Sequence, residues 1–223
     1  MPLAALGFIL MCRLDLRRAA AAAAYRLSPS DAYVVRNYAR VQAEIGRGDA
    51  AVSAASRYGA LDPLAANSAG ALGAILFRAG RLDAAIAMLR QPLVRLPGDP
   101  EAGFDLGIAL LTAGRTAEAL TQAQSMPLDG WQSLTVRAIA LARLGNRAGP
   151  DAALDRPRRL DTAWYQVAEV SAQRGAIDDA FAALGRAEAM VDPGLVEVKV
   201  DPMLSPLHDD PRYVAMIRRI GFP

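Results

Sequence analysis

Glycine recurs at a fixed interval through the middle of this 223-residue chain. Gly46, Gly80 and Gly114 stand 34 residues apart, and an alanine follows each of them at the same offset. These alanines are Ala51, Ala85 and Ala119. A period of 34 residues is the length of a helix-turn-helix unit, which buries its apolar face by stacking on neighbouring units. The spacing therefore predicts a stack of helix pairs and indicates a protein that holds other molecules.

Other positions recur with the same period. Seven residues ahead of each glycine lies a small residue, which would let two helices approach closely. These small residues are Ala39, Gly73 and Gly107. Pro63 and Pro97 lie seventeen residues after the first two glycines, where a helix has to end because proline lacks an N–H group. Trp131 takes that place after the third glycine. Each turn is also followed by a carboxylate in the first turn of the next helix, where the helix dipole favours negative charge. These carboxylates are Asp49, Asp83 and Glu118.

These positions resemble the tetratricopeptide repeat (TPR), a family with small and large residues at fixed places on two antiparallel helices. The resemblance implies an all-α fold, namely a right-handed superhelical TPR solenoid of antiparallel helix pairs. This solenoid would have about five units, together with a degenerate N-terminal unit and a C-terminal capping helix. We expect a single solenoid domain over residues 1–223. Its parts are N-terminal capping helices at 1–31, repeats at 32–65, 66–99, 100–130, 131–160 and 161–193, and a C-terminal loop and capping helix at 194–223. A content of 53% hydrophobic but only 6% aromatic residues fits the close-packed aliphatic core of such a stack.

The later units depart from the regular period. Gly145 and Gly175 follow at shorter intervals of 31 and 30 residues. Pro150 stands where the fourth unit should have its packing alanine, so we expect the second helix of that unit, roughly 149–156, to be short or distorted. Pro92 inside the second helix of the second repeat should kink that helix or begin a new turn.

The N-terminal stretch from Pro2 to Cys12 is apolar, but it is far short of the ~20 residues that span a bilayer. It also lacks the basic region of a secretion signal. One interpretation is a helix that packs on the first repeat, and the alanine run at 19–24 then predicts the second helix of the opening unit. The other is an exported or lipid-anchored protein modified at Cys12, although Met11 is large for the position before such a cysteine. We expect a cytoplasmic protein.

The C-terminal segment from Val196 to Pro223 resembles the closing segment that follows the TPR arrays of bacterial multidomain regulators of the adenylate-cyclase-like, kinase-like and winged-helix types. Asp210 can cap a helix whose first residue is Pro211. The apolar face of that helix would comprise Tyr213, Met216, Ile217 and Ile220. We expect the segment to cover the exposed core of the last repeat. Because repeats and caps already use residues 1–223, the resemblance implies an interaction role and not a catalytic one.

Residue types that carry catalysis or bind metal ions are scarce. A single histidine, His208, and a single cysteine, Cys12, build neither a disulfide framework nor a Cys/His zinc site. Lys199 is the only lysine and has no glycine-rich loop around it. The paired carboxylates Asp178 and Asp179 are expected at a helix start. We therefore predict a protein that is not an enzyme and has no cofactor and no metal ion.

A net charge of +2 without a dense basic run argues against binding to nucleic acid. The TPR resemblance instead implies a concave groove lined by the first helix of each unit. The groove positions of the family fall on Tyr33, Arg36, Asn37, Arg40, Phe77, Arg78, Phe104, Asp105 and Ile108. Further groove positions are Glu44, Asn67, Glu101 and Leu111, and the fifth unit adds Tyr165, Gln166, Glu169 and Gln173.

A peptide suited to this groove would carry an acidic residue or a C-terminal carboxylate near Arg36 and Arg40, and an apolar residue over Phe77 and Phe104. For Phe104 and Ile108, packing between helices is the alternative to exposure in the groove. The sequence thus predicts a non-catalytic scaffold or adaptor that binds a peptide or partner protein. The alternative is a stand-alone or truncated sensory or regulatory TPR module of a bacterial signalling or transcription-regulator system.

Overall fold

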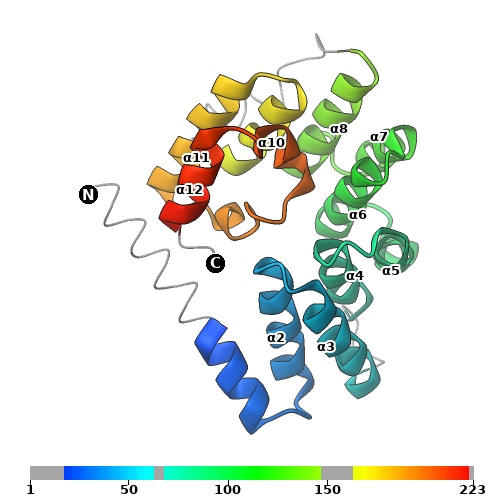
Figure 1. Cartoon of the computed structure of the whole chain (residues 1–223). Coiled ribbons are helices and arrows are strands. Elements are labelled where there is room, and N and C mark those ends of the chain that lie inside the picture. Colours follow the sequence, from blue (N-terminus) through cyan, green and yellow to red (C-terminus); the bar gives the residue numbers. More distant parts are fainter. Residues whose placement is uncertain (1–17, 63–67, 147–162, 221–223) are drawn as a thin grey trace. The chain divides into compact units, whose positions relative to one another are not determined.

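The computed structural model describes residues 18–62, 68–146 and 163–220, and every regular element in these ranges is a helix (Figure 1). The all-α prediction is therefore confirmed. The chain divides into two compact modules. The described residues up to Arg95, together with Ile217–Ile220, form the N-terminal module, and the described residues from Leu96 to Met216 form the C-terminal module. The expected single domain over the whole chain stays a prediction.

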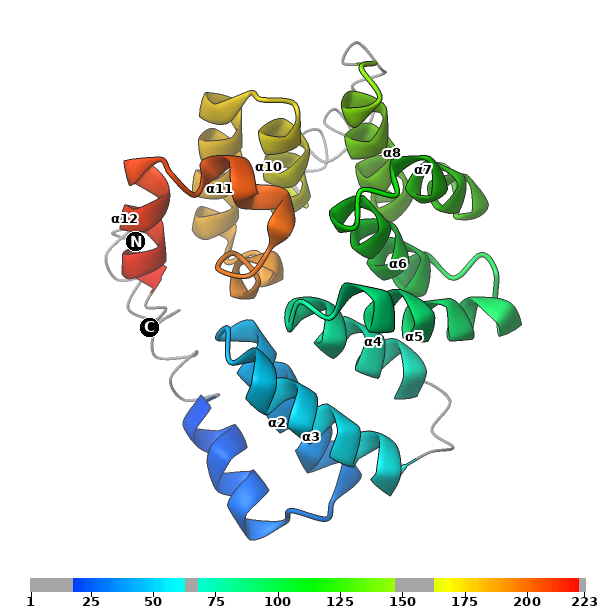
Figure 2. The same ribbon diagram turned by 45° about the vertical axis from the view of Figure 1, so that its right-hand side comes forward.

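The N-terminal module is built of helix pairs. Residues 18–27 are helical. They are followed by the pair α2 (Ala32–Glu44) and α3 (Gly48–Leu61) and by the pair α4 (Ser68–Arg78) and α5 (Leu82–Arg95). Figure 2 shows the two helices of each pair side by side. The buried core around α2 and α3 is made mainly of alanine, and it comprises Val35, Ala39, Ala43, Ala51, Ala54, Ala55, Tyr58 and Ile75.

The helix at residues 18–27 packs on α2 through an aromatic pair. The rings of Tyr25 and Tyr38 are stacked with their centroids 4.3 Å apart and their planes 6° from parallel. This contact agrees with the interpretation of the alanine run as a helix of the opening unit. The apolar stretch at 2–12, with its two alternative interpretations, lies outside the described residues.

The C-terminal module continues the pairing and then changes character. Its helices are α6 (Pro100–Thr112), α7 (Thr116–Ser125), α8 (Trp131–Arg143), α10 (Trp164–Gln173) and α11 (Ile177–Met190). Two short 3₁₀ helices follow, η1 (Pro193–Val196) and η2 (Pro202–Leu207), and α12 (Pro211–Ile220) ends the described chain. The second helix expected at 149–156 lies outside the described residues.

Five turn glycines adopt the left-handed conformation that the repeat requires. Their φ angles are 80° at Gly46, 74° at Gly80, 73° at Gly114, 86° at Gly145 and 78° at Gly175. At the first of them the glycine N–H donates to the Ala43 carbonyl (2.9 Å), and the next N–H, of Arg47, donates to the Gln42 carbonyl (2.8 Å). The same two bonds recur at the other four turns and satisfy carbonyls at the end of each first helix. The glycine period therefore arises from one helix-ending motif.

Small residues ahead of the turns allow close helix contacts, as predicted. A Cβ atom added to Gly73 on α4 would lie 2.6 Å from Leu89 Cγ on α5. A Cβ atom added to Gly107 on α6 would lie 2.8 Å from Val136 Cγ1 on α8. The first contact joins the helices of one pair, and the second joins first helices of successive pairs. The alanines that follow the turn glycines are fully buried, and they are Ala51, Ala85 and Ala119.

Pro92 does not end α5, which continues to Arg95.

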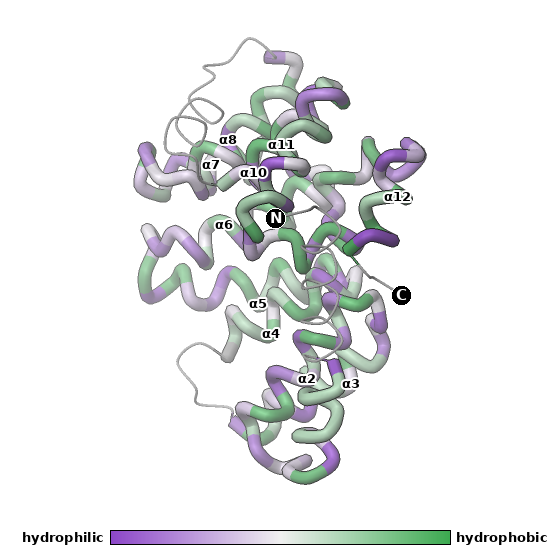
Figure 3. The backbone as a smooth tube through the Cα atoms, turned by 90° about the vertical axis from the view of Figure 1, so that its left-hand side faces the viewer, coloured by the Kyte–Doolittle hydropathy of each residue, from purple (hydrophilic) through white to green (hydrophobic). Residues whose placement is uncertain are grey.

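No described helix is long and apolar enough to cross a membrane. In Figure 3 hydrophobic and hydrophilic residues are interspersed along the labelled helices.

The closing segment begins α12 as predicted. The Asp210 Oδ1 atom accepts a bond from the Arg212 N–H (2.8 Å), and the helix starts at Pro211. The Arg212 guanidinium also bonds Asp178 at the start of α11 (2.8 Å). On α12, Tyr213, Met216 and Ile220 are buried and Ile217 is half-buried. The predicted apolar face is thus confirmed.

Candidate functional site

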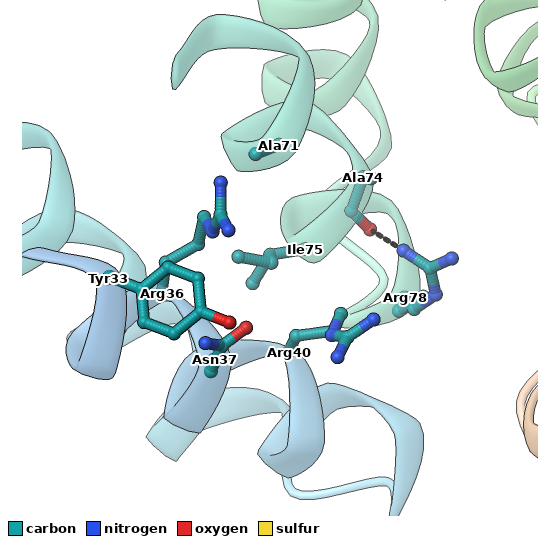
Figure 4. A pocket seen from close by; sticks show the side chains of 8 residues that line it. All are labelled: Tyr33, Arg36, Asn37, Arg40, Ala71, Ala74, Ile75 and Arg78. Carbon is teal, nitrogen blue, oxygen red and sulfur yellow. Dashed lines mark hydrogen bonds between the residues drawn. The ribbon is translucent and has the colours of Figure 1, made fainter. Parts of the chain in front are cut away.

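The described residues of α2 and α4 form a pocket of about 330 Å³ in the N-terminal module (Figure 4). Four of its lining residues come from α2 and four from α4. They are Tyr33, Arg36, Asn37 and Arg40 on α2, and Ala71, Ala74, Ile75 and Arg78 on α4. In Figure 4 the side chains of the two helices gather around Ile75.

The helical period explains why these residues share one pocket. On each helix the lining residues stand at positions i, i+3, i+4 and i+7, which fall on one face of an α-helix. The N-terminus of α2 is fixed by Asp31, whose Oδ1 accepts the Val34 N–H (3.1 Å). On the opposite side of α2, Val35 and Ala39 are fully buried in the core. The core packing of α2 therefore turns the polar face toward the pocket.

The pocket combines an apolar floor with a cationic rim. Ile75 is buried, and the small side chains of Ala71 and Ala74 lie half-buried beside it. The Arg36 guanidinium lies 5.2 Å from the centre of the Tyr33 ring, a cation–π contact that orients the arginine. Tyr33 itself is 67% exposed. The rim is thus accessible to solvent, although Arg36 is oriented by its contact with Tyr33.

The other two arginines are also oriented by neighbouring groups. Arg40 Nε lies 3.7 Å from Glu44 Oε1, one turn later on α2. Arg78 Nη1 donates to the Ala74 carbonyl (3.3 Å), as Figure 4 shows. Among the described residues that line the pocket, three are arginines and none is acidic. This arrangement favours an anionic group bound at the rim with a short apolar side chain over Ile75.

Five of the nine expected groove residues lie in this pocket: Tyr33, Arg36, Asn37, Arg40 and Arg78. Phe77 is half-buried on α4 and is not among the lining residues. The alanines and the isoleucine of the floor were missing from the expected binding set. The sequence feature that could have identified them is the same i, i+3, i+4, i+7 spacing. It becomes visible when the sequence of α4 is aligned with that of α2.

The other three expected residues lie on α6, in the C-terminal module. Phe104 packs edge-on against Trp131, with ring centroids 5.0 Å apart. Asp105 is half-buried, and Ile108 is only 5% exposed. For Phe104 and Ile108 these contacts agree with the alternative of packing between helices. A role of the three residues in binding stays a prediction.

The further groove positions have mixed surroundings. Glu44 is buried and pairs with Arg40, Leu111 is fully buried, and Asn67 lies outside the described residues. Glu101 is exposed and its Oε1 accepts a bond from Gln132 Nε2 (2.8 Å).

The expectation of an open groove at the fifth unit was wrong. Tyr165 and Glu169 on α10 are only 2% and 4% exposed. The closing segment covers them, because η2 packs on α10 and the Gln173 Nε2 atom donates to the Met203 carbonyl (2.7 Å). The closing segment therefore covers the side of α10 that the repeat register assigns to the groove. Among the described residues, no group of three or more His, Cys, Asp or Glu side chains is placed to hold a metal ion.

Comparisons with known proteins gave a family model that matches part of this chain and a solved structure that is similar to it. Residues 76–144 match the family model of the tetratricopeptide repeat. Among solved structures, the chain is similar to the crystal structure of YrrB, a TPR protein with an unusual peptide-binding site. That similarity has 18% sequence identity and a TM-score of 0.46, and it covers 81% of this chain and 96% of the other. No curated protein matches the sequence.

Proposed function

We propose that this tetratricopeptide-repeat protein is a non-catalytic interaction scaffold, and that an extended segment of a partner protein binds it in the α2–α4 pocket. The bound segment carries an acidic side chain or a C-terminal carboxylate. The observation that carries this proposal is the gathering of three arginines, Asn37 and Tyr33 around the small apolar floor at Ile75. The tetratricopeptide repeat supports the coarser role of a protein-interaction scaffold.

The arginines suit a carboxylate better than lysines would. A guanidinium is planar and presents several N–H donors in a fixed fork, so it can hold both oxygens of a carboxylate at once. Arg36 is half-buried, and its contact with Tyr33 reduces the side-chain freedom that binding has to remove. These features strengthen the ion pair relative to one on a fully exposed surface.

The remaining lining groups suit the ligand's main chain and its apolar part. The Asn37 side chain offers a donor and an acceptor, which can pair with a peptide N–H and C=O at the same time. Ala71 and Ala74 leave room for a main chain to approach α4, and Ile75 offers a surface for one apolar side chain. The pocket therefore fits a short segment with an acidic group next to an apolar residue.

The test is selection from a random peptide library displayed with free C-termini, followed by fluorescence anisotropy with a labelled selected peptide. We expect selected peptides to be rich in Asp, Glu or terminal carboxylates. The double variant Arg36→Glu with Arg40→Glu should weaken binding by about tenfold or more, because it replaces charge-assisted hydrogen bonds with repulsion. A matched control is Arg26→Glu with Arg90→Glu, which changes the charge equally at exposed positions that do not line the pocket.

The control variant should bind within a factor of about two of the wild type, since exposed charges outside the pocket are screened by salt. Equal binding by the pocket variant and the wild type would contradict the proposal. So would a selection that yields basic peptides.

A second candidate function is a regulatory module of a bacterial signalling or transcription system. It rests on the resemblance of the segment from Val196 to Pro223 to the closing segment of such regulators. The test is co-expression with a cyclase, kinase or winged-helix protein encoded beside it. Co-purification of the two proteins would favour this candidate, and separate elution would count against it.

A further inference from the structure

In the C-terminal module, the segment Asp201–Leu207 packs on α10. Met203, Leu204 and Leu207 of this segment are fully buried. Arg143 on α8 donates from Nε and Nη2 to Gln173 Oε1 (2.9 and 2.6 Å), and Gln173 Nε2 donates to the Met203 carbonyl. The segment is thus held through its main chain and through its apolar side chains.

A buried carboxyl pair lies at the start of this segment. The Tyr165 hydroxyl donates to Asp201 Oδ2 (2.8 Å), and the Met203 N–H donates to Asp201 Oδ1 (2.8 Å). The Glu169 side chain is also hydrogen-bonded to Asp201, so one of the two carboxyl groups carries a proton. The other oxygen of Glu169, Oε2, is buried and has no hydrogen-bond partner. The two bonds that Asp201 accepts stabilise its ionised form, so we assign the shared proton to Glu169.

The surrounding charges do not balance a second negative charge here. Asp192, after α11, and Glu197, between η1 and η2, both act on Glu169 by like-charge repulsion. Burial raises the pKa of Glu169 well above its usual range, and burial raises the pKa of Asp201 to about 6. Tyr165 on α10 stays neutral, since burial raises its pKa too.

Further charged and titratable groups lie on the elements around the pair. Arg143 on α8 is bonded to Gln173 and to the Leu111 carbonyl, and Arg186 on α11 lies over the Trp164 ring. The Tyr213 hydroxyl on α12 donates to the Val198 carbonyl. Lys199 lies half-buried in the loop before η2. Arg143, Arg186 and Tyr213 are thus engaged in contacts of their own.

We propose that residues 201–207 form an intramolecular latch over α10, held closed by the single proton that Glu169 and Asp201 share. Loss of this proton leaves two adjacent carboxylates in a buried site, and the repulsion is relieved when the segment leaves α10 and Glu169 reaches water. The opened state exposes Tyr165, Glu169 and Gln173, the groove positions of the fifth repeat. The latch is separate from the α2–α4 pocket and does not depend on the function proposed for it.

The test is hydrogen exchange measured by mass spectrometry at about pH 6 and about pH 9, corrected for the intrinsic exchange rate. A peptide containing residues 203–208 reports on the latch, since the Met203 N–H is bonded to Asp201 and the His208 N–H to the Ser205 carbonyl. Release of one proton on opening should lower the corrected protection of this peptide by about tenfold or more over that range. Peptides from α2 and α3 should keep their protection.

Glu169→Gln is the decisive variant, because its amide can donate to Asp201 and carries no proton that is lost. Its protection at 203–208 should change much less than that of the wild type between the two pH values. Glu197→Gln, a control, removes a neighbouring charge without touching the shared proton and should keep the pH dependence. Glu169→Met, which also carries no titratable proton, replaces Glu169→Gln should that variant fail to fold. Protection in the wild type that does not change with pH would overturn the proposal, and so would an unchanged pH dependence in Glu169→Gln.

Discussion

The first and the fifth repeats present the same helix positions in opposite ways. Counted back from the turn glycines Gly46 and Gly175, Arg36 corresponds to Tyr165 and Arg40 corresponds to Glu169. On α2 these positions line an accessible pocket, whereas on α10 they are buried beneath the chain's own closing segment. The repeat therefore determines which side chains face a ligand, and it leaves open whether that ligand is a partner or another part of the same chain.

The chemistry of the two faces differs with their occupants. The α2–α4 face is cationic and half-exposed, so it suits an anionic segment from another molecule. The α10 face offers Tyr165 and Glu169, and these meet Asp201, the start of a segment already attached to the chain. A tethered segment has a high effective concentration, so it can be held by contacts that would bind a free peptide weakly.

The cover over α10 should be weakened most by removing a buried side chain of η2. Leu204→Ala deletes a fully buried side chain of η2 and should lower the free energy of unfolding by about 3 kcal/mol, because the lost apolar contacts leave a cavity. Urea unfolding followed by circular dichroism measures the change. The exposed neighbour Ser205 provides the control, since Ser205→Ala should change stability by less than about 0.5 kcal/mol. Equal effects of the two substitutions would show that η2 does not hold the module together.

Much of the fold was predictable because its signals are local. The turn glycines adopt positive φ angles, a conformation that side-chain sterics disfavour in other residues, so their spacing in the sequence marks the helix ends. Gly73 and Gly107 sit where a methyl group would collide with the next helix, and this too is visible as a small residue at a fixed offset. The α2 part of the candidate site followed from the same register.

The covered face of α10 could not be predicted in this way. Its cover comes from residues about thirty positions later in the chain, and Pro202 and Pro206 break any helical period there. Met203, Leu204 and Leu207 therefore gave no recognisable pattern. The residues of α6 were placed in the groove for a related reason, since the repeat register alone does not tell that Phe104 packs against Trp131.

The pH dependence of stability should separate the two modules further. The folded protein raises the pKa values of Glu169 and Asp201, so it binds more protons than the unfolded chain at any pH between the unfolded and folded values. The contribution of this pair to stability should therefore be greatest below about pH 4. It should fall as the pH rises through about 6 and beyond. The rise of the Asp201 pKa to about 6 alone corresponds to a loss of about 3 kcal/mol, at about 1.4 kcal/mol per pKa unit. Thermal unfolding of the wild type and Glu169→Gln across this range measures it.

In Glu169→Gln the fall above about pH 6 should be much smaller, because only Asp201 remains to titrate. A wild-type stability that rises between about pH 6 and about pH 9 would contradict the assignment of a shared proton.

Two glycines of the C-terminal module offer a sharper comparison of crowded and open positions. A Cβ atom added to Gly194 in η1 would lie 2.5 Å from Tyr165 Cγ, and the buried ring carries the bond to Asp201. Gly194→Ala should therefore cost about 1–2 kcal/mol through displacement of Tyr165. Gly185 on α11 has open space around its Cβ position, so Gly185→Ala should stabilise the helix by about 0.5–1 kcal/mol. Urea unfolding of both variants checks the opposite signs, and a loss of stability in both would disprove the steric explanation.

The smallest expected effect comes from substituting one arginine at the α2–α4 pocket and one beside the covered face of α10. Arg143 on α8 orients Gln173 and donates to the Leu111 carbonyl, so Arg143→Gln should lower the free energy of unfolding by about 1 kcal/mol. Arg36 on α2 contacts the exposed ring of Tyr33, and Arg36→Gln should change stability by less than about 0.5 kcal/mol. The order should reverse for ligand binding, because Arg36 lines the open pocket and Arg143 serves the covered face. Urea unfolding and peptide anisotropy on the same two variants measure both orders, and a larger stability loss for Arg36→Gln would mean that the pocket arginine serves the fold rather than a ligand.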